Sequence, residues 1–506
     1  MNCGRPSPRT RRYLVGLVVA CSGVLAGAVG AAAAHGGAAA APSSPIAQVP
    51  TWAGVAVGLA LVALGVAAVG RGLGRATRAV GGVAVVLLAG SLLVAVVGAT
   101  GVGLPGGPST ETPLWVSDTG RDIGGNHHAA AVADGRVYAP LSGPGTPAGC
   151  ELVALHGSDG GVVWRAPVET NCTIHAVADP AVADSDGDGV AEVLVATTEE
   201  DLRTYSRDGD LLRRSALSDY GYTRPAVADL DGSDGPETIV VDVRGSVVVF
   251  DAAGEEVWRY ALDDYVWARP VVGDVDGDGS GEVFVAPRDG TLTLLSGDAT
   301  SGNDPTDDAD TAGPTVEWST AIGGSPDISW LAAGQADGDP ARELVVATVD
   351  GGVYAVDGAT GEVEWSRQVG SLAAVGGFGD GDGDGDSEVY VADHTGQVRA
   401  LDAATGDDEW VTRVTDGPVQ MMPPPSLGDT DGDGAADLIV PAHDGRVSKL
   451  DPADGHVIAR YAPAGVASDR GEDRIFARAT LGDLDGDGDD DAVVVYADGT
   501  VVGLDF

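Results

Sequence analysis

Aspartates alternate with small residues in a short stretch whose chemistry suits a cation. Residues 274–282 read Asp-Val-Asp-Gly-Asp-Gly-Ser-Gly-Glu, which places Asp274, Asp276, Asp278 and Glu282 at alternate or final positions. Carboxylates this close raise one another's pKa unless a positive charge lies between them. Calcium takes six to eight oxygen ligands, and glycines permit the tight turns that bend a loop around it. The stretch therefore predicts a calcium site.

The same pattern recurs along the chain at intervals of roughly 45 to 61 residues. Strand-like runs flank the loops and the last acid comes at the ninth position, so these are not EF-hands. Gln335 replaces an aspartate and should weaken its loop. The alternative is an acidic surface turn, but the acids keep their register while their neighbours vary. The other predicted ligands are Asp184, Asp186, Asp188 and Glu192; Asp229, Asp231, Ser233 and Glu237; Gln335, Asp337, Asp339 and Glu343; Asp380, Asp382, Asp384 and Glu388; Asp429, Asp431, Asp433 and Asp437; and Asp483, Asp485, Asp487 and Asp491.

Strand-like segments around each acidic loop predict a β-propeller. Every unit has four short runs rich in β-branched residues, with turn signals such as Arg244-Gly245 between them. A repeat of this length with four strands is typical of one propeller blade. The loop falls between the first two strands, where calcium would stabilise the fold rather than take part in catalysis. An acidic insertion, about 301–314, is expected between the third and fourth strands of its blade.

The two ends of the repeat region predict how the ring closes. One unit precedes the first acidic loop, and its turn at Asp134-Gly135-Arg136 is too short to hold an ion. The last unit ends at Phe506 after three strands, so segment 113–116 should supply the fourth and remove an exposed edge. The predicted fold is an all-β, eight-bladed propeller over residues 113–506. The strands of the first unit are expected near 128–133, 137–141, 151–155 and 162–166.

The composition is strongly acidic, with 76 Asp and Glu against 29 Lys and Arg and a formal charge of −47. Lys449 is the single lysine. Nucleic-acid binding is excluded, because it needs basic residues to neutralise phosphates. A highly charged surface remains hydrated and soluble where concentrated salt screens its self-repulsion, so we expect a salt-loving source.

Residues 1–101 are expected to form a membrane anchor of three transmembrane helices, joined to the propeller by linker 102–112. Each apolar stretch is close to the roughly 20 residues that cross a bilayer. Arginines precede the first stretch and lie between the second and third. The positive-inside rule then puts the N-terminus in the cytoplasm and the propeller outside the plasma membrane. The predicted helices are 13–34, 52–70 and 79–100.

Cysteines raise two further questions. Val18-Val19-Ala20-Cys21 is similar to a lipobox and follows an arginine pair, so a cleaved or lipidated N-terminus is the alternative to a retained first helix. Cys150 and Cys172 lie in the region expected outside the membrane. They are predicted to form a disulfide, with two buried thiols as the alternative.

Two resemblances bear on the fold. Segments 355–365 and 400–410, which end at Trp365 and Trp410, resemble the tryptophan-docking motif of quinoprotein-type eight-bladed propellers. The acidic loops are similar to the cation loops of FG-GAP and VCBS repeats. The quinoprotein resemblance implies a vicinal cysteine pair beside a quinone in the dehydrogenases, and this chain has no such pair. A quinone-dependent enzyme is therefore not expected, and fold alone does not decide function.

A possible ligand site lies where the innermost strands begin, near one mouth of the axial channel. Arg224, Arg269 and Arg478 share one position five residues before a loop, and Trp330 and Asp179 stand there in other units. Three arginines would receive an anionic group. The alternative is that they pair with nearby aspartates or cover neighbouring blades.

Histidines are assigned ordinary surface roles. His127 and His128 open the first blade, His394 and His443 fall in turns, and no histidine metal cluster is predicted. The leading functional prediction is a membrane-anchored extracellular calcium-binding propeller that acts as a non-enzymatic binding or adhesion module for a protein or glycan. The alternatives are an exported enzyme or ligand sensor that uses the channel mouth, and an envelope-assembly scaffold.

Overall fold

The structure is a computed structural model, and the chain divides into two units, Met1–Pro105 and Gly106–Phe506. The predicted membrane helices, Cys21 and Ser233 lie outside the described residues. Within the described part of the chain, no helix has the length and apolar character to span a membrane. The described residues are 108–506 except 118, 120–122, 144–148, 169–171, 233–234, 301–312, 324–326 and 464–473.

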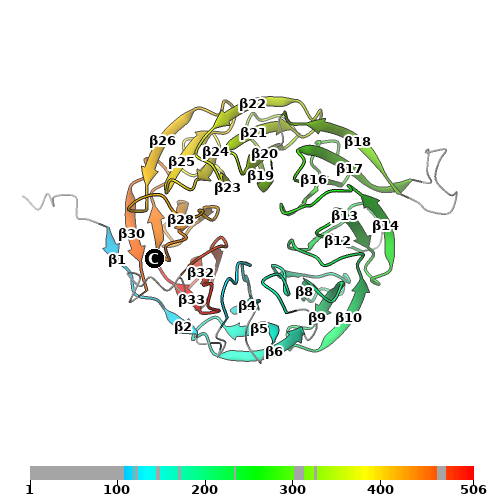
Figure 1. The fold of residues 1–506 in the computed structure, drawn as a ribbon, viewed down its shortest axis with the longest axis horizontal. Helices are drawn as coiled ribbons and strands as arrows, with labels where there is room; N and C mark the ends of the chain where they lie inside the picture. Colours follow the sequence, from blue (N-terminus) through cyan, green and yellow to red (C-terminus); the bar gives the residue numbers. More distant parts are fainter. Residues whose placement is uncertain are drawn as a thin grey trace, which may run out of the picture. The chain divides into compact units, whose positions relative to one another are not determined.

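Eight β-sheets stand in a ring around a central axis (Figure 1). We number these blades 1 to 8 from the first complete sheet. This confirms the predicted all-β eight-bladed propeller. The strands of blades 1 to 4 are β3 (Ala131–Ala133), β4 (Arg136–Leu141), β5 (Cys150–His156) and β6 (Val162–Val168); β7 (Ala181–Ala183), β8 (Glu192–Thr197), β9 (Asp201–Tyr205) and β10 (Leu211–Ala216); β11 (Ala226–Ala228), β12 (Glu237–Val241), β13 (Ser246–Phe250) and β14 (Glu256–Ala261); and β15 (Val271–Gly273), β16 (Glu282–Val285), β17 (Thr291–Thr300) and β18 (Gly313–Ala321).

Blades 5 and 6 repeat the same order of four strands, and blades 7 and 8 each include a strand from the start of the propeller unit. The strands of blades 5 to 8 are β19 (Ile328–Gly334), β20 (Glu343–Thr348), β21 (Gly352–Asp357) and β22 (Val363–Gln368); β23 (Ala374–Gly379), β24 (Glu388–Ala392), β25 (Gln397–Asp402) and β26 (Asp408–Arg413); β27 (Ser426–Gly428), β28 (Asp437–Pro441), β29 (Val447–Leu450) and β30 (Val457–Tyr461) with β1 (Ser109–Thr110); and β31 (Thr480–Gly482), β32 (Asp491–Val495) and β33 (Val501–Leu504) with β2 (Trp115–Ser117).

The ring closes as predicted, through a strand from the start of the propeller unit. Strand β2 pairs antiparallel with β33, with Trp115 opposite Gly503 and Val116 opposite Val502. This pairing completes blade 8 and covers an edge that would otherwise invite pairing with another chain. Strand β1 adds a parallel fifth strand to β30 of blade 7, which the sequence did not predict.

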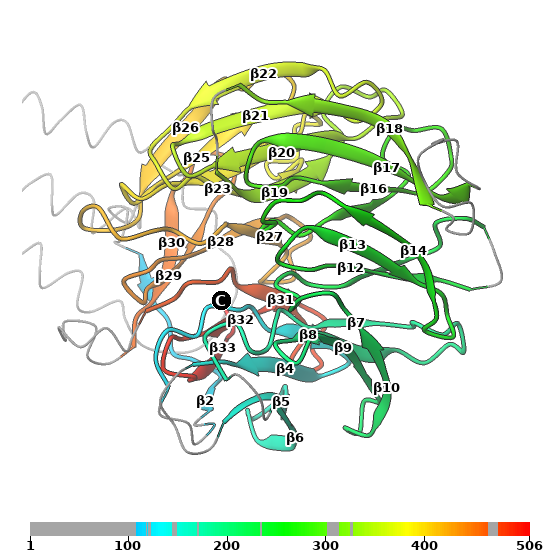
Figure 2. The same ribbon diagram turned by 45° about the vertical axis from the view of Figure 1, so that its right-hand side comes forward.

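Apolar residues of neighbouring blades form the core, because successive sheets face one another around the ring (Figure 2). In blades 2 to 8 the second strand is buried along its whole length; every residue of β12 (Glu237–Val241), for example, is buried. Between blades 5 and 6, Val345 and Ala355 belong to the same cluster as Val375 and Val389. Full burial of one such valine stabilises the fold by roughly 1.5 kcal/mol or more.

Tryptophans on the outer strands fasten one blade to the next. Trp365 of β22 donates its Nε1 hydrogen to the Ala403 carbonyl of blade 6 at 2.8 Å, and Trp410 donates to Pro452 of blade 7 at 2.6 Å. Gly406 has a φ of +71°, and a Cβ atom there would lie 2.5 Å from the Trp365 ring. Glycine is therefore required for the indole to lie on this turn.

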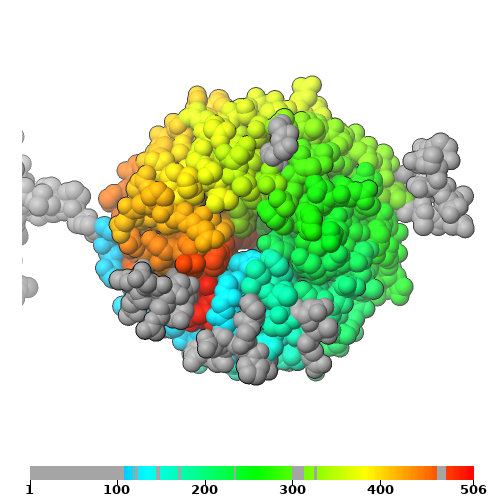
Figure 3. Space-filling view, viewed as in Figure 1, coloured from blue at the N-terminus to red at the C-terminus, as the bar shows by residue number. Residues whose placement is uncertain are grey.

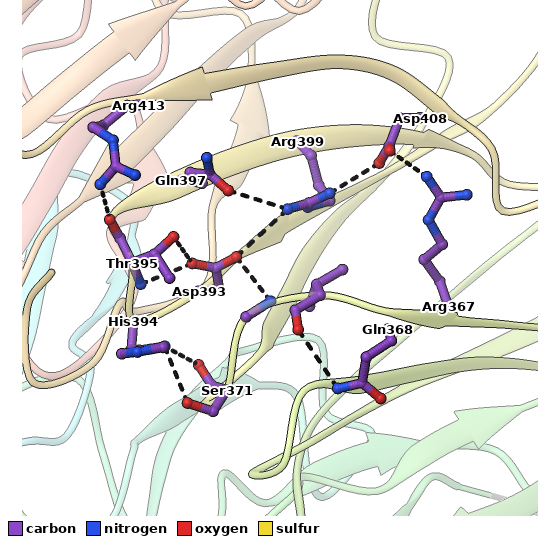
Figure 4. A network of polar contacts seen from close by, with 12 residues as sticks. Arg367, Gln368, Ser371, Asp393, His394, Thr395, Gln397, Arg399, Asp408 and Arg413 are labelled. Carbon is purple, nitrogen blue, oxygen red and sulfur yellow. Dashed lines mark hydrogen bonds and ion pairs between the residues drawn. The ribbon is translucent and has the colours of Figure 1, made fainter.

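Polar contacts also join blades 5 and 6 (Figure 4). Arg399 lies between Asp408, at 3.0 Å, and the buried Asp393, at 3.6 Å. Arg367 of blade 5 reaches the same Asp408. Since Asp393 also accepts a hydrogen bond from the Gly370 amide at 3.1 Å, the two blades share one continuous network.

Cys150 of β5 and Cys172, in the connection to the next blade, form a disulfide with their Cα atoms 5.3 Å apart. The bond ties the third strand of blade 1 to the chain that leads into blade 2.

Candidate functional site

The acidic loops lie between the first and second strands of blades 2 to 8, as the repeat predicted. In blade 4, ligand oxygens of Asp274, Asp276 and Glu282 lie within 4.8 Å of one another. Glu282 is 2% exposed and accepts a hydrogen bond from the Val275 amide at 2.9 Å. Burial, helped by the charges of Asp276 and Asp278, raises the pKa of Glu282 to about 7. The loop thus gathers negative charge that a cation would compensate.

The other loops repeat this construction. The acid at the ninth position is buried at the start of the second strand, and it accepts a hydrogen bond from the amide of the second position. The earlier aspartates lie toward the solvent, and Asp184 and Asp380 each accept an amide hydrogen from a loop glycine. The structure brings together the sets Asp184, Asp186 and Glu192; Asp229, Asp231 and Glu237; and Asp337, Asp339 and Glu343.

One loop already holds a positive charge. The Lys449 ammonium lies 2.8 Å from both Asp431 and Asp437 in the blade 7 loop, and its side chain is only 2% exposed. Lys449 pairs with Ile439 across β28 and β29, a position that Leu294 occupies in blade 4. The single lysine of the chain therefore stands beside the carboxylates that a metal ion would bind in the related loops.

In the blade 5 loop, the Gln335 side chain makes hydrogen bonds within the loop. The Gln335 side-chain amide donates to the Pro340 carbonyl at 3.2 Å and also to the Ala341 carbonyl. Backbone carbonyls at this point are the oxygens that complete a calcium shell. Because the amide hydrogens take these acceptors, blade 5 is expected to bind a cation more weakly than blade 4.

A cavity of about 510 Å³ lies on the axis of the propeller, lined by residues from all eight blades. The space-filling view shows the molecule hollowed at the centre of the ring (Figure 3). The position singled out in the sequence faces this cavity in every blade. The residues at that position are Ala129, Asp179, Arg224, Arg269, Trp330, Val375, Pro424 and Arg478.

The arginines at this position, on blades 3, 4 and 8, bring three positive charges to the same cavity. Arg224 donates to the Pro180 carbonyl at 2.9 Å, and within the described residues none of the three arginines forms an ion pair. Repulsion from Arg478, followed by burial, lowers the pKa of Arg269 to about 9, and burial with the Arg478 charge lowers that of Arg224 to about 10. Arg224 and Arg269 therefore stay charged at neutral pH. Arg224 also donates to the Ala130 carbonyl at 3.3 Å, so it reaches two neighbouring blades, as the alternative of covering neighbouring blades expects.

The part of the cavity lined by blades 5 to 7 is mainly apolar. Trp330, Val375, Phe378 and Pro424 line the cavity on blades 5 to 7. Asp179 is the acid at the shared position, and it is engaged by His128. Burial would raise the pKa of Asp179, but the hydrogen bond from His128 and nearby positive charges outweigh this and lower it. The cavity thus combines an excess of positive charge with an apolar face.

Three histidines meet beside this cavity, and two of them, His127 and His128, line it, which corrects the surface roles predicted for these two. His127 Nε2 lies 2.9 Å from His175 Nδ1, and the stacked His128 is 3% exposed. Burial lowers the pKa of His127 to about 3 and that of His175 to about 4, so both are neutral at pH 7. His443, at 7% exposure, is also buried. The sequence held no signal for the cluster, since 48 residues separate His127 from His175.

The cavity does not fit a quinone. The adjacent cysteines that accompany the quinone in dehydrogenases are absent from the sequence, and the Cys150–Cys172 disulfide is not among the residues that line the cavity. We therefore derive no redox step for this site.

Several solved structures of other proteins share this fold. BamB from Moraxella catarrhalis is 16% identical over 77% of this chain and 98% of its own, with a TM-score of 0.50. Saccharomyces cerevisiae Sqt1 is 9% identical over 78% and 99%, with a TM-score of 0.56. A quinohemoprotein alcohol dehydrogenase from Pseudomonas putida HK5 is 14% identical over 78% and 76%, with a TM-score of 0.50. These likenesses show the fold alone.

Comparison of the sequence with known proteins and protein families identifies the family of this chain. No curated protein sequence matches the chain. A family model described as outer membrane protein assembly factor BamB matches residues 198–373 and 308–499, which together exceed half of the chain. The chain therefore belongs to the family of BamB-like, PQQ-type propellers.

Proposed function

We propose that this chain is a non-enzymatic binding propeller of the cell surface, anchored in the plasma membrane by segments 13–34, 52–70 and 79–100. Its axial cavity receives an anionic group of a protein or glycan partner. The observation that carries this proposal is that Arg224, Arg269 and Arg478 line one cavity and form no ion pair in the described residues, although the chain carries 76 acidic residues.

The physical reason is the free-energy cost of holding like charges together without a counter-ion. Three cations close together in a partly desolvated cavity repel one another, and an anion with hydrogen-bond acceptors removes that repulsion. A carboxylate suits the guanidinium geometry, because it accepts two parallel hydrogen bonds. The apolar wall at Trp330 and Phe378 would cover an aromatic or aliphatic part of the same ligand.

Calcium in the acidic loops has a structural role in this proposal. A cation between the first two strands of a blade would hold a glycine-rich loop that loses much entropy on ordering. The support comes from blade 7, where the buried Lys449 ammonium already lies between Asp431 and Asp437. We assign cations to the loops of blades 2, 3, 4, 6 and 8, and weak binding to blade 5.

Family membership favours a second candidate, a scaffold for assembling envelope proteins. The family is described as an assembly factor, and BamB itself has the same fold. Such a scaffold would recognise its clients through the outer strands or the rim. The exposed Leu211 and Leu212 on the edge strand β10 would suit that mode of contact.

The test is capture of partners from envelope extracts with the purified full chain in detergent. We expect the Arg269→Ala/Arg478→Ala variant to lose the captured protein or glycan, while Arg367→Ala, which removes a charge on the outer strand β22, retains it. Retention by the cavity variant, with loss after substitution of Leu211 and Leu212, would favour the assembly scaffold. Free uronic acids as competitors would show whether the recognised anion is a sugar carboxylate.

A further inference from the structure

From the geometry of the histidine cluster we propose that His127, His128 and His175 bind one divalent transition-metal ion, of the class of Zn²⁺, at the wall of the axial cavity. Each offers a ring nitrogen, and these nitrogens lie within 4.8 Å of one another. Imidazole suits Zn²⁺, Cu²⁺ and Ni²⁺ better than Ca²⁺, which prefers oxygen. The site is therefore chemically distinct from the acidic loops.

Two of the histidines are held in the way that metal-binding imidazoles usually are. His127 Nδ1 lies 2.9 Å from the Gly125 carbonyl, and His128 Nδ1 lies 2.9 Å from the Asp179 carboxylate. Each acceptor takes the Nδ1 hydrogen, which leaves the Nε2 lone pair available. A backbone carbonyl and a carboxylate are the common outer partners of metal-bound histidine, where they fix the ring and raise its basicity.

The buried nitrogen of His128 is an independent sign of a missing ligand. Its Nε2 atom makes no hydrogen bond with any described residue, although the side chain is only 3% exposed. Leaving a buried polar atom without a partner costs roughly 1 to 3 kcal/mol. A metal ion would satisfy this nitrogen.

The spacing of the other two nitrogens also suits a metal ion. His127 Nε2 and His175 Nδ1 are 2.9 Å apart. Two ligands at about 2.0–2.1 Å from a tetrahedral zinc ion lie roughly 3.3 Å from each other, so a small separation of the rings admits the ion. Without metal, His175 Nδ1–H donates to His127 Nε2. With metal, the neutral His175 ring carries its hydrogen on Nε2, so that the lone pairs of His175 Nδ1 and His127 Nε2 both face the ion.

The residues and the open space around the three histidines also suit a metal site. The Tyr222 ring lies 5.3 Å from the His128 ring and 5.0 Å from the His175 ring, and so limits their movement. His127 and His128 also line the axial cavity, which leaves a fourth position to water or to an anion. Three protein ligands with one open position is the pattern of an exchangeable metal site.

Zinc titration of the full chain in detergent tests the proposal, with no polyhistidine tag and with saturating calcium to fill the acidic loops. After chelation and recalcification, isothermal titration should show one equivalent of Zn²⁺. His127→Ala and His175→Ala should abolish it, and His394→Ala, in a turn of blade 6, should retain it. Asp179→Asn acts on a positioning residue and should weaken Zn²⁺ binding by about 10- to 100-fold.

Cobalt gives a readout that does not depend on the variants folding. Co²⁺ bound to three imidazoles and water should give the intense visible bands of a four-coordinate ion in the wild-type chain. Absence of these bands together with absence of a zinc equivalent would overturn the proposal. Equal zinc binding by wild type and a folded His175→Ala chain would also overturn it, since the metal would then lie elsewhere.

Discussion

The acidic loops and the axial cavity are opposite in charge and opposite in repetition. The loops recur in seven of the eight blades with nearly the same acidic residues, whereas the shared position at the cavity carries six different residue types in eight blades. A feature repeated in seven blades suits a need that these blades share, and we propose that this need is the stability of the first hairpin. Residues that differ from blade to blade around one axis can contact different chemical groups of one ligand and so recognise it. We therefore place stability in the loops and recognition in the cavity.

The acidic loops of blades 7 and 4 also differ from each other. Its carboxylates are neutralised by Lys449, while the loop of blade 4 has only Leu294 at the corresponding position. One loop carries its own cation, and in our proposal the other obtains one from solution. A lysine in place of a bound ion keeps the loop of blade 7 neutralised, which is what a loop with a stabilising role requires.

Calcium removal should have the largest effect. A ligand at 100 times its dissociation constant stabilises the fold by about 2.7 kcal/mol per site, so five emptied loops should lower the melting temperature on the order of 10 °C. Differential scanning calorimetry with a chelator at the working salt concentration measures this. An unchanged melting temperature would contradict the proposal that calcium in the loops stabilises the fold.

Substitution of the lysine should come next. In Lys449→Leu, the Asp431 and Asp437 carboxylates lose their ammonium, and we expect a loss of roughly 2 to 3 kcal/mol without calcium, since one partner is half exposed. Calcium should restore most of it, and the variant should bind one ion more than wild type. The double variant Lys449→Leu/Asp431→Asn is the control, and calcium rescue there would mean that the ion binds elsewhere.

The cavity arginines should hardly affect stability. Because Arg478 and Arg269 repel each other, Arg269→Ala/Arg478→Ala should melt within about 2 °C of wild type or slightly above it. Thermal melts at matched salt and calcium check this. A large fall would mean that the arginines hold the ring together, and the division between loops and cavity would fail.

The glutamine loop offers the smallest change. Gln335→Asp restores the first carboxylate and removes the amide that donates to Pro340 and Ala341. We expect tighter calcium binding by blade 5 and a rise in melting temperature of about 1 °C in excess calcium. Equilibrium dialysis against radioactive calcium counts the ions, and an unchanged count would show that the charge at this position does not set affinity.

Local sequence patterns predicted much of this structure. The repeat predicted the blades, Trp115 predicted the closing strand, and the register of Arg224, Arg269 and Arg478 predicted a common location on the axis. These features follow from periodicity, which a single sequence displays.

Contacts between distant residues were not predictable in the same way. His127 and His175 come from the connections before two different blades, and Lys449 reaches its loop from the neighbouring strand. Nothing in the loop sequence predicts the contact with the lysine, and nothing near His127 and His128 predicts that His175 joins them. Such pairings depend on how sheets pack, which periodicity leaves open.

The most direct test of the account is the affinity of the captured partner for two variants measured side by side. For Arg269→Ala/Arg478→Ala, we predict affinity at least about 10-fold weaker with an unchanged melting temperature. For Asp274→Asn/Asp276→Asn in the blade 4 loop, we predict affinity close to wild type with a lower melting temperature. Wild-type affinity in the cavity variant, or lost affinity in a folded loop variant, would contradict the account.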